Sequence, residues 1–245
     1  MQFAGSHILT VSQFERADVE QLFAVADAMR PYAHRERMTR VLEGAILGSM
    51  FFEPSTRTRI SFGSAFNLLG GEVRETTGFE HSAIAKGESL YDTARVLSGY
   101  SDIIVMRHPE AGSVAEFAHA SRVPVINGGD GANEHPSQAL LDLYTIRSEL
   151  AGRDRGLDGL RIAMVGDLRY GRTVHSLSKL LSLFSGLRVS LVSPDALSMP
   201  GDVVEALQAA GHEVLQTDSL ERGIAGMDIV YSTRIQEERF ASAEE

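Results

Sequence analysis

The sequence predicts an α/β protein with two domains, each a parallel sheet flanked by helices. Short apolar runs alternate with amphipathic segments along all 245 residues, as expected for strands joined by crossover helices. Residues 152–159 interrupt this alternation with three glycines and four charged residues. The length suits two domains of about 120 residues each. We therefore expect one domain at residues 1–150 and the other at residues 151–245.

In the first domain, the hydrophobic pattern predicts an initial helix followed by alternating strands and helices. The expected helices cover residues 14–29, 56–69, 88–100, 113–120 and 136–150. The expected strands cover residues 45–52, 72–75, 102–106 and 123–126. Pro136 suits the first turn of its helix, because the N–H that proline lacks has no partner there.

In the second domain, the same alternation resumes. The expected strands cover residues 161–165, 188–192, 212–215 and 228–232, and the expected helices cover residues 172–184 and 201–210. Consecutive strands joined by helices indicate parallel pairing with right-handed crossovers. Open parallel sheets bind ligands beyond the carboxyl ends of their strands, so the turns after the strands are the first places to search for a site.

The composition excludes several classes of protein. With 43% hydrophobic and 23% charged residues the chain has the profile of a soluble globular protein. No apolar run reaches the roughly 20 residues that span a bilayer, and no secretory signal is recognisable, so we expect a cytoplasmic protein without a membrane partner. The absence of cysteine excludes thiol chemistry within this chain. The net charge of −10 argues against nucleic acid as a partner.

The most informative turn follows the strand expected at residues 45–52. Pro54 ends that strand, and Ser55 or Thr56 is a suitable N-cap for the next helix. The turn carries three hydroxyls and two arginines: Ser55, Thr56, Thr58, Arg57 and Arg59. Free backbone N–H groups and the helix dipole favour an anion here, although the glycine-rich pattern of nucleotide hydrolases is absent. We expect a phosphate-like dianion; an ordinary capped helix with surface arginines is the alternative.

Four further strand ends carry cations, histidines or carboxamides. They are residues 107–109, 127–138, 166–172 and 233–236. One arginine at a strand end is usually a solvated residue, but five such turns together favour a cleft between two domains that binds a strongly anionic substrate. Residues 166–171 lack dinucleotide-binding spacing, and the histidines lack paired spacing for a metal. We therefore expect neither a cofactor nor a metal.

The turn at residues 55–59 and the turn at residues 127–138 carry longer motifs. Ser55-Thr56-Arg57-Thr58-Arg59 resembles the carbamoyl phosphate signature of the transcarbamoylase family, and His135-Pro136-Ser137-Gln138 resembles its second signature. Residues 107–109, 166–176 and 233–236 resemble the aspartate branch of that family. The likeness runs from about residue 12 to the end of the chain. It implies transfer of the carbamoyl group from carbamoyl phosphate to the amine of L-aspartate, the committed step of pyrimidine synthesis.

The resemblance also implies a role for individual residues. Those expected to hold the phosphate are Ser55, Thr56, Arg57 and Thr58. Those expected around the carbonyl oxygen are Thr58, Arg107 and His135, with Gln138 on the carbamoyl amide. Those expected to grip the aspartate carboxylates are Arg172, Arg234 and Gln236. Ser82 and Lys86 match positions that reach the site of a neighbouring subunit, which implies a homotrimer with shared sites and a catalytic role for Lys86.

The chain departs from the family at its end. Ser242-Ala243-Glu244-Glu245 has the pattern of a capping box, and the later segments of family members have no counterpart, so we expect an incomplete aspartate domain. Two alternatives follow. One is an ornithine- or other amine-specific enzyme, which Arg172 and Arg234 disfavour; the other is an inactive chain that only binds carbamoyl phosphate. The sequence leaves open a regulatory chain and nucleotide effectors.

Overall fold

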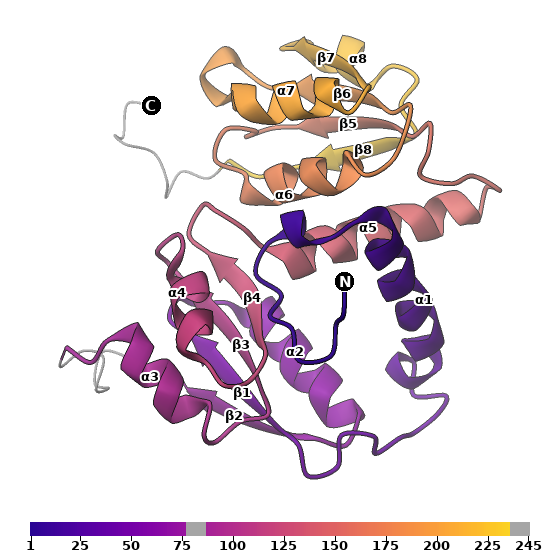
Figure 1. The fold of residues 1–245 in the computed structure, drawn as a ribbon. Helices are drawn as coiled ribbons and strands as arrows, with labels where there is room; N and C mark the ends of the chain where they lie inside the picture. The colour runs from indigo at the N-terminus through magenta and orange to yellow at the C-terminus, as the bar shows by residue number, and fades with distance from the viewer. Residues whose placement is uncertain (77–86, 236–245) are drawn as a thin grey trace. The chain divides into compact units, whose positions relative to one another are not determined.

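The computed structural model describes residues 1–76 and 87–235, and these fall into two compact units that meet in the sequence between residues 137 and 138. Each unit contains its own parallel sheet of four strands flanked by helices (Figure 1). This is the fold class that the sequence predicts. The domain boundary expected at residue 150 stays a prediction; helix α5 (Pro136–Ala151) begins in the first unit and continues in the second.

The first unit has a sheet in the order β2-β1-β3-β4. Its strands are β1 (Ile46–Phe51), β2 (Glu72–Thr76), β3 (Ile103–His108) and β4 (Val125–Asp130). Its helices are α1 (Arg16–Ala33), α2 (Thr56–Leu68), α3 (Leu90–Leu97) and α4 (Ser113–Ala120), preceded by the 3-10 turn η1 (Val11–Gln13). Because β1, β3 and β4 are parallel neighbours, their carboxyl ends lie along one edge of the sheet.

The core of the first unit has a layer on each face of this sheet. Ile104 and Met106 of β3 pack with Phe117 of α4 in one cluster. Val105, between them in sequence, packs on the opposite face with Phe51 of β1 and the partly buried Phe62 of α2. Apolar residues therefore occupy consecutive positions in β3, because helices cover both faces of a parallel sheet.

The second unit has a sheet in the order β7-β6-β5-β8. Its strands are β5 (Arg161–Val165), β6 (Arg188–Val192), β7 (Glu213–Thr217) and β8 (Ile229–Ser232). Besides most of α5, its helices are α6 (Arg172–Leu181), α7 (Gly201–Ala209) and α8 (Leu220–Ile224), with the 3-10 turn η4 (Asp195–Leu197). The strand order reverses at β5, which lies between β6 and β8, and such a reversal creates a crevice at the carboxyl ends of those strands.

Several elements differ in their bounds from the sequence prediction; helix α1, for example, runs from residue 16 to residue 33. Strands β3 and β4 continue to His108 and Asp130, which pair with each other. The sequence assigned these polar ends to turns, because apolar periodicity stops at residue 106 and at residue 126. Helix α8 was not predicted, since five residues are too few to establish a helical period.

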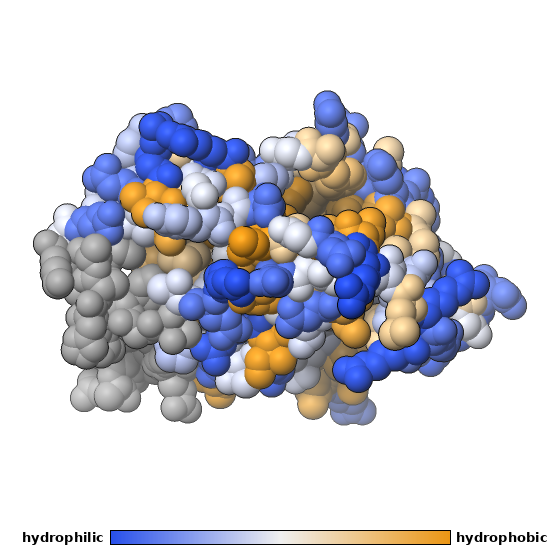
Figure 2. All heavy atoms as spheres, turned by 90° about the horizontal axis from the view of Figure 1, so that it is seen from below, coloured by the Kyte–Doolittle hydropathy of each residue, from blue (hydrophilic) through white to orange (hydrophobic). Residues whose placement is uncertain are grey.

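No helix in the described ranges is long and apolar enough to cross a membrane. On the face shown in Figure 2, apolar residues lie interspersed among hydrophilic ones.

Candidate active site

The turn between β1 and α2 is an open anion-binding turn. Ser55 is the N-cap residue of α2, with extended backbone angles of −155° and 100°, and its side chain makes no capping hydrogen bond. The first N–H groups of a helix have no acceptor within the helix. At this turn both those groups and the Ser55 hydroxyl therefore remain available to a ligand.

The two arginines of this turn have different environments. Arg57 is exposed, and within the described part of the chain its guanidinium has no hydrogen-bond or ion-pair partner. In contrast, Arg59 lies 4.0 Å from Glu75 through its Nε, which is buried and makes no hydrogen bond to the described residues. Arg57 is thus the cation of this turn that is free to meet an anion.

Arg107 lies beside this turn and is paired with a carboxylate. It stands opposite Phe51 in the pairing of β1 with β3, and its carbonyl accepts a 2.9 Å hydrogen bond from Phe52 N–H. Its Nε and Nη2 both lie 2.5 Å from Glu53 Oε1, and its Nη1 lies 3.4 Å from the Gly128 carbonyl. Glu53 was not among the residues expected from the sequence, because its pairing with Arg107 follows from the register of β1 and β3.

A buried aspartate organises the loop that carries His135. Asp130 is 2% exposed and accepts four hydrogen bonds of 2.9 to 3.0 Å. The donors are the backbone N–H groups of Gly112 and Glu134 and the side-chain amides of Asn127 and Asn133. His135 follows directly, is 5% exposed, and has its Nδ1 3.3 Å from the Ser137 hydroxyl. The loop is therefore fixed before any ligand arrives.

In the second unit, close packing of two strand ends positions Arg172 and Arg234. Thr233 N–H donates to the Val165 carbonyl at 2.8 Å, so the end of β8 lies against the end of β5. Gly166 permits this contact: it has φ +116°, and an added Cβ would lie 2.6 Å from Thr233 Oγ1. Arg172 begins α6 and is 7% exposed, whereas Arg234 is exposed.

Gln138 lies in the first turn of α5, within the second unit. Its Nε2 donates to Asp142 Oδ1 at 2.8 Å. Ser82, Lys86 and Gln236 lie outside the described residues, so their roles stay predictions.

Two histidines near the strand ends have structural contacts. His108 Nδ1 accepts a 3.1 Å hydrogen bond from Glu110 N–H, and His175 Nε2 lies 2.7 Å from the Leu168 carbonyl. Burial is the main cause that lowers the pKa of each. Among the described residues, no group of three histidine, aspartate or glutamate side chains is placed to hold a metal.

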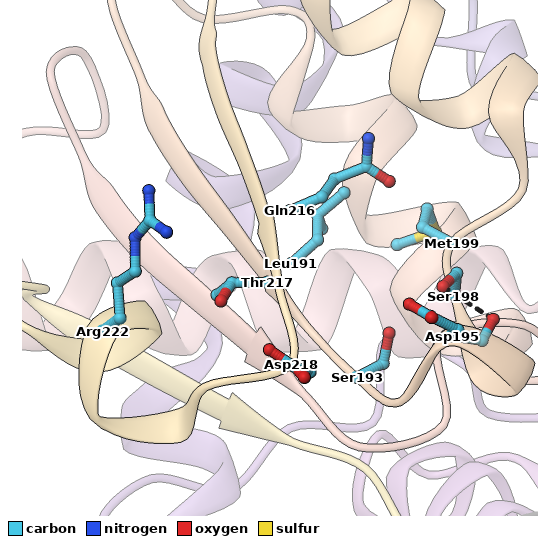
Figure 3. Close-up of a pocket in the computed structure, with 9 residues that line it drawn as sticks. All are labelled: Leu191, Ser193, Asp195, Ser198, Met199, Gln216, Thr217, Asp218 and Arg222. Atoms are coloured by element: carbon cyan, nitrogen blue, oxygen red, sulfur yellow. Dashed lines mark hydrogen bonds between the residues drawn. The ribbon is translucent and has the colours of Figure 1, made fainter.

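A separate pocket of about 450 Å³ lies at the carboxyl ends of β6 and β7 (Figure 3). None of the expected site residues lines it. Asp195 and Asp218 contribute carboxylates to its wall, and the Arg222 side chain extends away from both in Figure 3. Two carboxylates disfavour an anionic ligand, so this pocket does not match the substrate class indicated by the arginine-bearing turns.

Family models match both halves of the chain. The model described as aspartate/ornithine carbamoyltransferase, carbamoyl-P binding domain, matches residues 6–148, and that of the Asp/Orn binding domain matches residues 158–245. This chain belongs to the aspartate/ornithine carbamoyltransferase family. The predicted family and fold class are thereby confirmed.

Among curated proteins, the chain is similar to catalytic subunits of aspartate carbamoyltransferase. The chain is 74% identical to the aspartate carbamoyltransferase catalytic subunit of Saccharophagus degradans, over all of this chain and 73% of that protein. It is 71% identical to the protein of the same name from Cellvibrio japonicus, over all of this chain and 72% of the relative.

Solved structures agree. The catalytic subunit of M. jannaschii aspartate transcarbamoylase is 45% identical with a TM-score of 0.89, covering 98% of this chain and 77% of its own. Aspartate transcarbamoylase from Trypanosoma cruzi in complex with carbamoyl phosphate is 43% identical, also with a TM-score of 0.89, covering 98% and 75%.

Proposed function

We propose that this chain transfers the carbamoyl group of carbamoyl phosphate to the amine of L-aspartate, giving N-carbamoyl-L-aspartate and phosphate in pyrimidine synthesis. The observation that carries the proposal is the open N-terminus of α2, where Arg57 pairs with no described residue, beside Arg107 of β3. The names of the relatives at 74% and 71% identity support the same reaction.

The first unit supplies the groups for the leaving phosphate. Ser55, Thr56 and Thr58 offer hydroxyls and first-turn N–H groups, and Arg57 offers a planar fork that can bond two phosphate oxygens at once. Negative charge accumulates on the phosphate as the carbamoyl bond breaks. Donors and a cation already aimed at that charge therefore lower the barrier.

Arg107 and His135 act with Thr58 on the carbonyl oxygen. The attacking amine adds to the carbonyl carbon, and charge grows on this oxygen as the tetrahedral intermediate forms. Each pre-aimed donor of this kind typically contributes about 3–4 kcal/mol to transition-state stability. Glu53 pairs with Arg107 in the ligand-free chain. The carbonyl oxygen of the substrate must therefore either displace this carboxylate from Arg107 or share Arg107 with it.

Arg172 and Arg234 select the acceptor. Two arginines suit the two carboxylates of L-aspartate, since guanidinium groups bond carboxylates bidentately. Ornithine has a cationic side chain that these arginines would repel. A Trypanosoma cruzi relative has been solved with carbamoyl phosphate and aspartate together, which supports the same substrate pair here.

The assembly that we propose is a cytoplasmic homotrimer, with Ser82 and Lys86 completing the site of a neighbouring copy and Lys86 serving as a point charge. The curated relatives are named catalytic subunits, which leaves a place for a regulatory chain. Sedimentation equilibrium tests the trimer. Mixing an inactive Arg57→Ala chain with an inactive Lys86→Ala chain tests the shared site, because mixed trimers would contain intact sites and regain activity.

The experiment that tests the function offers carbamoyl phosphate with either L-aspartate or L-ornithine and measures the carbamoylated product. We expect product with aspartate and none with ornithine. Product with ornithine would reassign the acceptor. Carbamoyl phosphate binding without product from either amine would identify a chain that binds this substrate and does not turn it over.

A further inference from the structure

We infer that Asp142 is a positioning residue that fixes the orientation of the Gln138 carboxamide and so selects the carbamoyl end of the substrate. The inference rests on the proposed function, because it takes Gln138 to face the carbamoyl group. Asp142 has no role in the assignments that the sequence motifs provide.

Asp142 holds Gln138 from the next turn of the same helix. Residues four apart on a helix lie on one face, and here Gln138 Nε2 donates to Asp142 Oδ1 at 2.8 Å. The second carboxylate oxygen accepts a 2.8 Å hydrogen bond from the Tyr231 hydroxyl of β8. Both carboxylate oxygens of Asp142 thus have a donor, and all three residues belong to the second unit.

The chemistry of a carboxylate allows one orientation of the amide. An ionised carboxylate only accepts hydrogen bonds, so the amide nitrogen of Gln138 must face Asp142. The amide oxygen then points away from it. No described residue donates to that oxygen. A fixed acceptor of this kind recognises the NH₂ group of carbamoyl phosphate and gains nothing from the methyl group of acetyl phosphate.

Tyr231 keeps Asp142 in the accepting state. Tyr231 donates to Asp142 from β8, outside the helix that carries this carboxylate. Burial, with the nearby Asp142 charge, raises the pKa of Tyr231, so its hydroxyl stays a donor. Burial also raises the pKa of Asp142, while the hydrogen bonds from Tyr231 and Gln138 oppose that rise by stabilising the carboxylate.

These two hydrogen bonds join Gln138 to β8, next to the proposed acceptor site. Tyr231 lies three residues before Arg234. The orientation of the carbamoyl-facing amide therefore depends on β8 as well as on its own helix.

An isosteric substitution of Asp142 distinguishes a change in the orientation of the Gln138 amide from a change in packing. We expect the Tyr231 hydroxyl to keep donating in Asp142→Asn, so that it takes the only oxygen of the new amide and leaves an NH₂ group facing Gln138. The Gln138 amide must then turn over to accept from it, and presents NH₂ in place of oxygen to the substrate. In a Tyr231→Phe background the asparagine is free to turn, so the Gln138 orientation recovers.

Calorimetric titration with carbamoyl phosphate, acetyl phosphate and inorganic phosphate tests the inference. Asp142→Asn is expected to weaken carbamoyl phosphate binding about tenfold, the effect of one hydrogen bond, and to change the other two affinities less than twofold. In the Tyr231→Phe background the same substitution is expected to cost less than threefold. Asp92→Asn is the matched control, because Asp92 is a helical aspartate that accepts from the Ser89 hydroxyl at 2.7 Å.

An unchanged preference for carbamoyl over acetyl phosphate in Asp142→Asn would overturn the inference. An equal loss of all three ligands would also overturn it, because that pattern indicates general damage. If this variant does not fold, Asp142→Ser removes the anchor with a smaller side chain and must show the same selective loss. A wild-type chain without any preference for carbamoyl phosphate would instead refute the proposed function.

Discussion

The two units present their arginines in opposite ways. Arg57 of the first unit is exposed on an open helix N-terminus, with an N-cap hydroxyl that makes no capping bond. Arg172 of the second unit is 7% exposed and follows a turn packed tightly against the end of β8. The first arrangement is a local device made by a few consecutive residues. The second depends on tertiary contacts, so substitutions should affect the two differently.

The largest expected effect is the loss of turnover in Arg57→Ala. This arginine has no described partner whose loss would disturb the fold, so the variant should melt like the wild type while its rate falls about 10²–10³-fold or more. Product formation and thermal unfolding by circular dichroism check both halves of this prediction. Arg59→Ala is the comparison on the same helix, and we expect it to lose much less activity. A near-normal rate in Arg57→Ala would remove this residue from the mechanism.

The next effect separates the two substrates. Arg234→Ala should raise the KM for aspartate about 10–100-fold, because one bidentate contact to a carboxylate is lost, and should change the carbamoyl phosphate KM far less. Initial rates with each substrate varied in turn measure both constants. Equal increases in the two constants would contradict the proposed role of Arg234.

The sequence indicates some residues of the first unit's site more clearly than others. The α2 turn was predictable because its hydroxyls, arginines and strand-ending Pro54 are consecutive. Glu53 was adjacent to it, but nothing local indicated that this carboxylate pairs with Arg107 across β1 and β3. A site made of consecutive residues can thus be recognised in the sequence, whereas an ion pair across a sheet can be predicted only when the strand register is known.

Contacts between residues far apart in the chain could not be predicted from the sequence. Asp142 and Tyr231 are 89 positions apart, and no periodicity relates them. The four donors that converge on Asp130 were also missed, because the strand containing it was predicted to end at residue 126. Most helices and strands could be predicted from hydrophobic patterning, since burial of one or both faces imposes that pattern.

A third prediction concerns the packed turn of the second unit. Gly166→Ala places a Cβ 2.6 Å from Thr233 Oγ1 at a φ of +116°, so it should destabilise this unit by about 1–3 kcal/mol. Hydrogen exchange locates the loss in β5 and β8. Inorganic phosphate binding, which belongs to the first unit, should be unchanged. If Gly166→Ala weakened phosphate binding while hydrogen exchange in β5 and β8 stayed as in the wild type, this prediction would be wrong.

The smallest expected effect is a pH dependence of stability in the second unit. Burial lowers the pKa of His212, and a backbone contact with Leu181 opposes part of that shift. The unfolded chain therefore takes up a proton near pH 6.5 that the folded chain resists, so the folded state loses stability as the pH falls below about 6.5. Urea unfolding at pH 7.5 and pH 5.5 should show a smaller loss in His212→Gln than in the wild type. The same loss in both would exclude His212 as the source.

Carbamoyl transfer itself is tested most directly with ¹³C-labelled carbamoyl phosphate and L-aspartate, followed by ¹³C and ³¹P NMR in one sample. The proposed function predicts that the label appears on the aspartate nitrogen as fast as inorganic phosphate is released, above the spontaneous rate of decomposition. Phosphate release without labelled carbamoyl-aspartate, or no reaction above that background, would contradict it.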